Sequence, residues 1–226
     1  MGAILGTSAE LFAASRQLAG NQSSIRLGVS PLVSPAVIAT TFDAFRADAR
    51  NVEVAFSEAN LEQLRADLIA GHLDLIIVPK IDTEIPGTTR VTIATERLHH
   101  VAKNQELAPQ TIELQDVADH TLVVVTDACG LTEVTRTVLQ SVGAEMKTHN
   151  ARATSYQRLI EWADLGLGDA FVPASRIPPG RASSVMVNAD QPVTIDFEAI
   201  WNVSAPANEI VAPAVDSMSG SEQHNA

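Results

Sequence analysis

The pattern of apolar and polar positions changes character along the chain and predicts alternating strands and helices. "IRLGVS", which begins at Ile25, is apolar at alternate residues, as in a strand, and "SPAVIATTFDAFRADA" follows with helical periodicity. Ser34 before Pro35 predicts the helix start, because a serine hydroxyl can accept a hydrogen bond from a free amide and proline suits the first helical position. The chain therefore opens its folded part with a strand–turn–helix unit.

The same order of elements then recurs. "NVEVAFSE" predicts a second strand, "NLEQLRADLIAGH" a helix that ends at Gly71, and "LDLIIVP" a buried third strand. Farther along, "TLVVV" predicts a strand, "DACG" a turn and "LTEVTRTVLQSVG" a helix, and "SYQRLIEWADLGLG" and "DAFVP" predict one more helix and strand. This repeated order favours an α/β protein with two similarly built, Rossmann-like lobes, each with a mostly parallel sheet.

Two long alternating stretches are suited to connect the lobes. "RVTIATERLHHVAKN" lies between them, and "VTIDFEAIWNV" near the end precedes a helix expected around residues 207–218. Two strand crossings return the chain to the first lobe, which is a hinge geometry with a cleft between lobes. We assign residues 25–99 and 194–218 to subdomain I and residues 100–193 to subdomain II.

The ends of the chain are expected to lie outside these lobes. Residues 8–19, "SAELFAASRQLA", have the spacing of an amphipathic helix, and "GNQSS" after them is typical of a polar linker. Residues 1–24 are therefore predicted to form a linker segment, and residues 219–226, "SGSEQHNA", a disordered tail.

Composition narrows the classes of partner. The net charge of −12 argues against direct nucleic-acid binding, because such surfaces are basic and clustered. No apolar run approaches the roughly 18 residues that span a bilayer, and the first residues lack the pattern of a signal peptide. We expect a cytoplasmic protein without a membrane partner.

The turns that follow the predicted strands are the candidate ligand site. In open α/β sheets, ligands bind beyond the carboxyl ends of parallel strands, where helix N-termini and hydroxyl groups favour an anion such as a carboxylate. Capping of a helix is the structural alternative for Ser34 and for Thr126 or Asp127, and equally for Glu58 and Asn60. Lys80 could either counter the anion or remain solvated. The predicted effector-binding residues are Ser30, Pro31, Ser34, Glu58, Asn60, Thr126, Asp127, Ala128 and Cys129.

Signals for catalysis and metal binding are weak. The sequence has no nucleophile-elbow motif and no phosphate-binding glycine motif. Cys129 with His120 or His149 could form a nucleophile–base pair, but nothing in their spacing supports it. The six histidines include His99 and His100 but show no helical ligand spacing, which favours structural or surface roles. We therefore predict no catalytic residue, no metal site and no cofactor, and hence not an enzyme.

The ordered segments resemble the effector-binding domain of LysR-type transcriptional regulators. The resemblance rests on "IRLGVSPLVSPAVIATTFDAFRADARNVEVAFSEANLEQLRADLIAGHLDLIIV", on "ERLHHVAKNQELA" and on "LIEWADLGLGDAFVPASRI", and covers residues 25–218. It implies a periplasmic-binding-protein-like (type 2) architecture with a small-molecule effector in the cleft, contacts at the positions named above, and antiparallel homodimers. It also implies that DNA is bound only through a winged helix-turn-helix, which these segments do not include.

Three functions follow from these expectations. The leading one is a ligand-sensing regulatory domain that binds a small anionic metabolite, within a longer regulator or as a natural stand-alone sensor. The first alternative is a solute-binding protein of the same fold. The second is a thiol-based redox sensor, since peroxide-responsive family members use a cysteine in a place similar to Cys129, at a helix start that lowers a thiol pKa. The second cysteine that usually resolves the oxidised thiol is absent, because Cys129 is the only cysteine.

Overall fold

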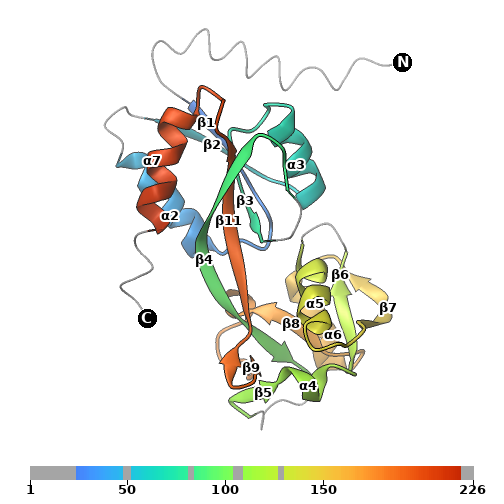
Figure 1. Ribbon diagram of the computed structural model, residues 1–226. Helices are drawn as coiled ribbons and strands as arrows, with labels where there is room; N and C mark the ends of the chain where they lie inside the picture. The colour runs from blue at the N-terminus through green and yellow to red at the C-terminus, as the bar shows by residue number, and fades with distance from the viewer. Residues whose placement is uncertain (1–23, 48–51, 81–83, 104–108, 127–129, 220–226) are drawn as a thin grey trace, which may run out of the picture.

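Two α/β lobes are joined by two long strands in the computed structural model (Figure 1). The joining strands are β4 (Thr88–Val101) and β11 (Thr194–Asn202), and they run side by side from one lobe into the other. The expected two-strand crossing is confirmed. The structure describes residues 24–47, 52–80, 84–103, 109–126 and 130–219.

The first lobe is built on three parallel strands. β1 (Ser24–Val29) lies between β2 (Glu53–Glu58) and β3 (Leu75–Pro79). Helices α2 (Pro35–Arg46) and α7 (Asn208–Ser219) pack together on one face, and α3 (Leu61–Ile69) covers the other (Figure 1).

Every residue of β3 is buried because both of its faces are covered. Leu75 and Ile77 belong to the larger apolar cluster with the α2 and α7 side, whereas Ile76 and Val78 belong to a smaller cluster with α3. Successive strand residues point to opposite faces, so the continuous apolar run "LIIV" supplies both layers of the core.

The crossing strands give the main sheet more antiparallel pairing than the sequence pattern predicted. β11 pairs antiparallel with both β3 and β4. With β9 (Ser184–Asn188) and β10 (Gln191–Pro192) of the second lobe, the hydrogen-bonded order is β10-β9-β4-β11-β3-β1-β2 and runs through both lobes. The expectation of a mostly parallel sheet in each lobe is therefore only partly right. In the first lobe, the parallel strands are extended by antiparallel β11. In the second lobe, Thr121–Val125 and Lys147–Ala153 form a separate parallel pair of strands, and the other strands of that lobe join β4 in the larger mixed sheet.

The second lobe contains the predicted elements and several short ones that the sequence pattern missed. Its helix α6 begins where Ser155 Oγ accepts a hydrogen bond from the Arg158 amide at 3.2 Å, and it ends at Gly166, whose φ is +81°. The missed elements are short or polar, so they carry little periodic signal. The elements of this lobe are β5 (Thr111–Glu113), α4 (Leu114–Val117), β6 (Thr121–Val125), α5 (Leu131–Gln140), β7 (Lys147–Ala153), α6 (Tyr156–Leu165), β8 (Ala170–Pro173), η3 (Ala174–Arg176), β9 (Ser184–Asn188) and β10 (Gln191–Pro192).

Two expectations about the ends of the chain differ in outcome. The helix expected near residues 207–218 is α7, and the Trp201 indole N–H on β11 donates to the Asn208 side chain at its start at 2.8 Å. The helix expected at residues 8–19 lies outside the described residues. None of the helices in the described ranges has the length and apolar character needed to cross a membrane.

Candidate functional site

The turn between β1 and α2 is buried and internally hydrogen-bonded. The Ser30 amide donates to the Ile77 carbonyl at 2.9 Å, and Ser30 Oγ accepts from the Leu32 amide at 3.3 Å. Ser34 Oγ accepts from the Val37 amide at 3.4 Å and so caps α2, as the structural alternative expected. Both serines are almost completely buried and fix the shape of the turn.

The structure brings the end of β2 next to this turn. Val29 and Glu58 are register partners in the parallel β1–β2 pair, so the two strands end at the same edge of the sheet. Glu58 is exposed there, and the Asn60 side-chain oxygen accepts from the Gln63 amide at 2.8 Å, which caps α3. The predicted first-lobe residues therefore share one edge, although Ser34 and Asn60 also have capping roles. Lys80 is half exposed and forms an ion pair of 3.7 Å with Asp196.

The matching turn in the second lobe is described only in part. Thr126 follows β6, is exposed, and its amide donates to the Ala153 carbonyl at 3.0 Å. It does not cap α5, because Gly130, with φ +85°, occupies the N-cap position without a side-chain hydrogen bond. The predicted contacts at Asp127, Ala128 and Cys129 lie outside the described residues.

The start of α5 in the second lobe lies against the first lobe. A Cβ atom placed on Gly130 would be 2.6 Å from Pro79 Cγ and 3.7 Å from Leu61 Cδ2. Pro79 ends β3 and Leu61 begins α3, so the carboxyl edge of the first-lobe sheet faces the helix N-terminus of the second lobe. Gly130, at the start of α5, therefore contacts the carboxyl edge of the first-lobe sheet, where the predicted first-lobe residues lie.

Arg176 spans the two lobes and was not singled out from the sequence. It belongs to η3 of the second lobe, and its Nη2 donates to the Pro31 carbonyl at 2.6 Å and to the Val33 carbonyl at 2.8 Å in the first-lobe turn. Its guanidinium carbon lies 5.1 Å from the centre of the Tyr156 ring, a cation–π distance. The Arg176 Nε–H is buried and makes no hydrogen bond within the described part of the chain.

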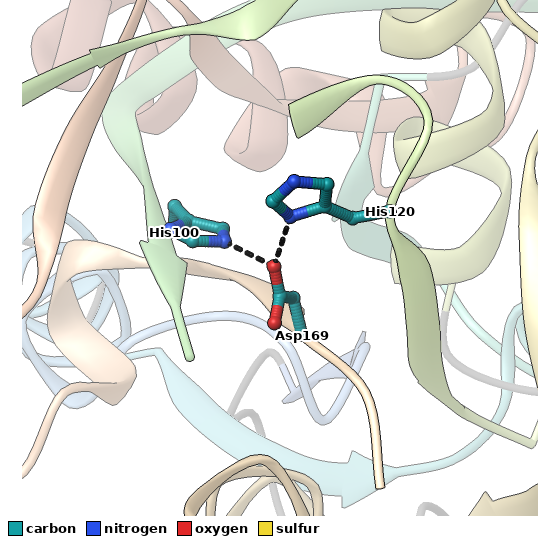
Figure 2. Close-up of side chains that lie close together, drawn as sticks. All are labelled: His100, His120 and Asp169. Atoms are coloured by element: carbon teal, nitrogen blue, oxygen red, sulfur yellow. Dashed lines mark hydrogen bonds and ion pairs between the residues drawn. The ribbon is translucent and has the colours of Figure 1, made fainter. Parts of the chain in front are cut away.

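A second cluster of polar side chains, formed by His100, His120 and Asp169, lies elsewhere in the second lobe. Asp169 Oδ2 is 2.7 Å from His100 Nε2 and 2.6 Å from His120 Nδ1 (Figure 2). Burial acts to raise the pKa of Asp169, but hydrogen bonds from both histidines outweigh it and lower that pKa below its usual range. His120 is therefore engaged with Asp169, which does not support its pairing with Cys129.

The family comparison agrees with this architecture. Residues 18–219 match the model described as the LysR substrate binding domain. The chain belongs to this family. Its periplasmic-binding-protein-like (type 2) fold is that of LysR regulatory domains.

Curated relatives are regulators of transcription. Escherichia coli OxyR, named a DNA-binding transcriptional dual regulator, is 26% identical over 173 residues, which are 74% of this chain and 55% of the relative. A protein from another Escherichia coli strain, named hydrogen peroxide-inducible genes activator, matches with the same identity and coverage. The chain thus spans about half the length of the curated relatives that it matches.

Solved structures share the fold at low sequence identity. A mutant of OxyR from Corynebacterium glutamicum superposes with a TM-score of 0.76 at 20% identity, over 96% of this chain and 70% of that one. The reduced form of OxyR from Neisseria meningitidis superposes with a TM-score of 0.70 at 13% identity, over 90% of this chain and 97% of that one. These similarities establish the fold of the two lobes.

Proposed function

We propose that the chain is the effector-sensing part of a cytoplasmic LysR-type transcriptional regulator and has no catalytic activity of its own. The observation that carries this proposal is the contact of Arg176 with the carbonyl groups of Pro31 and Val33. One side chain of the second lobe thereby holds the turn that opens the candidate site in the first. A ligand bound beside this turn would change how firmly the lobes are held together.

A small anion, such as a carboxylate metabolite, fits the chemistry of this place. The N-terminus of α2 carries a partial positive charge, and the buried Nε–H of Arg176 is a donor without a partner in the described residues. An anionic group could accept from that donor and approach the start of the helix. Ser30, Pro31, Ser34, Glu58, Asn60 and Thr126 are the proposed surroundings, with residues 127–129 completing the second-lobe side.

Sensing requires that the ligand favour one lobe arrangement over another, because a ligand that binds both equally shifts nothing. We place the moving bodies at residues 25–99 with 194–218 and at residues 100–193. The working unit is a homodimer with symmetric contacts. DNA is contacted only through a winged helix-turn-helix of the regulator, since the acidic net charge of −12 does not suit a DNA surface.

A thermal-shift screen of small carboxylates, amino acids and aromatic acids tests this proposal. A true effector raises the melting temperature of the parent protein by mass action and raises it less in Ser34→Ala, Thr126→Ala and Arg176→Ala. Arg158→Ala is the matched control, because Arg158 is an exposed arginine whose ion pair with Glu161 stays within α6. Equal ligand-induced shifts in all variants would contradict the site.

A peroxide-responsive thiol is the second candidate function. The observation that favours it is that a curated relative is named a hydrogen peroxide-inducible genes activator. Mass spectrometry after mild peroxide treatment tests it at Cys129, the only cysteine. Reversible sulfenic acid formation that is lost in Cys129→Ser supports a thiol sensor. An unmodified Cys129 in the folded protein contradicts it.

A further inference from the structure

Three side chains with metal-binding atoms converge in the second lobe. His100 comes from β4, His120 from the turn before β6, and Asp169 from the residue before β8. Their ligand atoms all lie within 4.8 Å of one another. Among the residues that the structure describes, no other group of three or more histidine, cysteine, aspartate or glutamate side chains lies this close together. Figure 2 shows both imidazole rings directed at the same carboxylate.

The backbone fixes these side chains in place. The Asp169 amide donates to the Thr121 carbonyl at 2.9 Å, and the Val123 amide donates to the Asp169 carbonyl at 2.8 Å. A Cβ atom on Gly168 would lie 2.6 Å from the Thr121 carbonyl oxygen, so glycine permits this close approach. His100 is opposite Phe171 in the β4–β8 ladder, two residues from Asp169. All three ligands are thus attached to hydrogen-bonded main chain, as a preorganised site requires.

The set of donor atoms suits a transition metal. Two imidazole nitrogens and one carboxylate oxygen are the ligands of many three-residue zinc sites, whereas Mg²⁺ and Ca²⁺ prefer oxygen ligands alone. We propose that His100 Nε2, His120 Nδ1 and the Asp169 carboxylate bind a divalent transition-metal ion of the zinc class. The fourth tetrahedral position then remains open toward solvent on the His120 side, since the His120 side chain is 49% exposed and that of His100 only 4%.

Metal binding requires the three donor atoms to adjust to the spacing of a tetrahedral site. In tetrahedral zinc sites with ligands at about 2.0–2.1 Å, neighbouring donor atoms are about 3.3 Å apart. The two nitrogens are 2.7 and 2.6 Å from Asp169 Oδ2, so each must move away from that oxygen by about 0.6–0.7 Å. The two nitrogens lie within 4.8 Å of each other and must also reach a separation of about 3.3 Å. A carboxylate only accepts hydrogen bonds, so each histidine donates an N–H to it; on metal binding, each proton occupies the other ring nitrogen and leaves a lone pair for the ion.

This metal site is separate from the effector site. Thr121 begins β6 beside the histidine cluster, and Thr126 follows the end of the same strand. A strand of five residues spans roughly 17 Å, so the two sites lie at opposite edges of the lobe. The ion would join β4 to the segments before β6 and β8, and it would stabilise the folded second lobe without blocking the cleft.

Calorimetric titration of the chelator-treated protein with Zn²⁺ tests the proposal. We expect one Zn²⁺ per chain, a rise in melting temperature with Zn²⁺ but not with Mg²⁺, and a visible Co²⁺ spectrum of tetrahedral type. His120→Ala and Asp169→Asn should weaken Zn²⁺ affinity by at least tenfold, since loss of even an outer-shell partner of a ligand costs about 10–100-fold. His120 lies at the surface, so its variant is expected to fold, which circular dichroism checks.

His72→Ala is the matched control. His72 is also an exposed histidine beside a carboxylate, with Nδ1 3.2 Å from Asp67 Oδ1, but it forms a pair rather than a group of three. Its removal should leave the Zn²⁺ titration unchanged. The proposal is overturned if the folded parent binds no Zn²⁺ in the micromolar range, or if His120→Ala and Asp169→Asn bind it as the parent does.

Discussion

Asp74 illustrates how a single side chain fixes the first strands of the sheet. Its Oδ2 accepts from the Arg26 amide at 2.8 Å and from Arg26 Nε at 3.0 Å, and its Oδ1 accepts from Arg26 Nη2 at 2.7 Å. The Asp74 amide donates in return to the Arg26 carbonyl at 2.9 Å. This bidentate ion pair aligns the start of β3 with β1, and the Asp74 carboxylate is largely buried.

Asp74→Asn should therefore lower the stability of the protein. The amide keeps the size of the side chain but loses the charge and one acceptor, which leaves Arg26 donors unsatisfied. We expect the free energy of unfolding to fall by about 2 kcal/mol, measured by urea denaturation. Glu161→Gln, which weakens the exposed pair with Arg158, should change it by less than about 0.5 kcal/mol. Equal effects of the two substitutions would contradict this role of Asp74.

At the scale of elements, local chemistry explains what the sequence could predict. Ser34 was predicted to start a helix and caps α2 in the structure. Asn60 and Ser155, the first residues of two other stretches predicted as helices, cap α3 and α6. Capping depends on residues three positions apart, so the sequence contains the whole signal. By contrast, β5, β7 and β9 were not predicted, because their strand character depends on partners distant in the chain.

Ser155→Ala tests the contribution of a single helix cap in the second lobe. Ser155 Oγ accepts from the Arg158 amide at 3.2 Å, and its loss leaves that amide dependent on water. We expect the free energy of unfolding to fall by about 1 kcal/mol. Ser155→Asp, which retains an acceptor at the same position, should restore most of the loss. Chemical denaturation of the three proteins measures both effects, and an unchanged midpoint in Ser155→Ala would show that the cap contributes nothing.

At the scale of the molecule, the lobes were predictable but their contacts were not. Two alternating stretches indicated the crossing strands, since strand periodicity is visible over a few residues. Arg176 and Pro31 are separated by 145 residues, and His100 and Asp169 by 69, so no spacing rule links them. The crossing strands could therefore be predicted from sequence, whereas the contact of Arg176 with the first-lobe turn and the histidine cluster required the fold.

Arg176→Ala should change the arrangement of the lobes while leaving each lobe folded. The substitution removes two hydrogen bonds to the Pro31 and Val33 carbonyls and the contact with the Tyr156 ring. Since β4 and β11 still connect the lobes, we expect unchanged circular dichroism, a larger radius of gyration in solution scattering, and faster amide hydrogen exchange in the turn at residues 30–34. Arg158→Ala should leave all three unchanged. If Arg176→Ala scatters and exchanges as the parent does, the lobes are held together by their apolar contacts near Gly130 and not by this arginine.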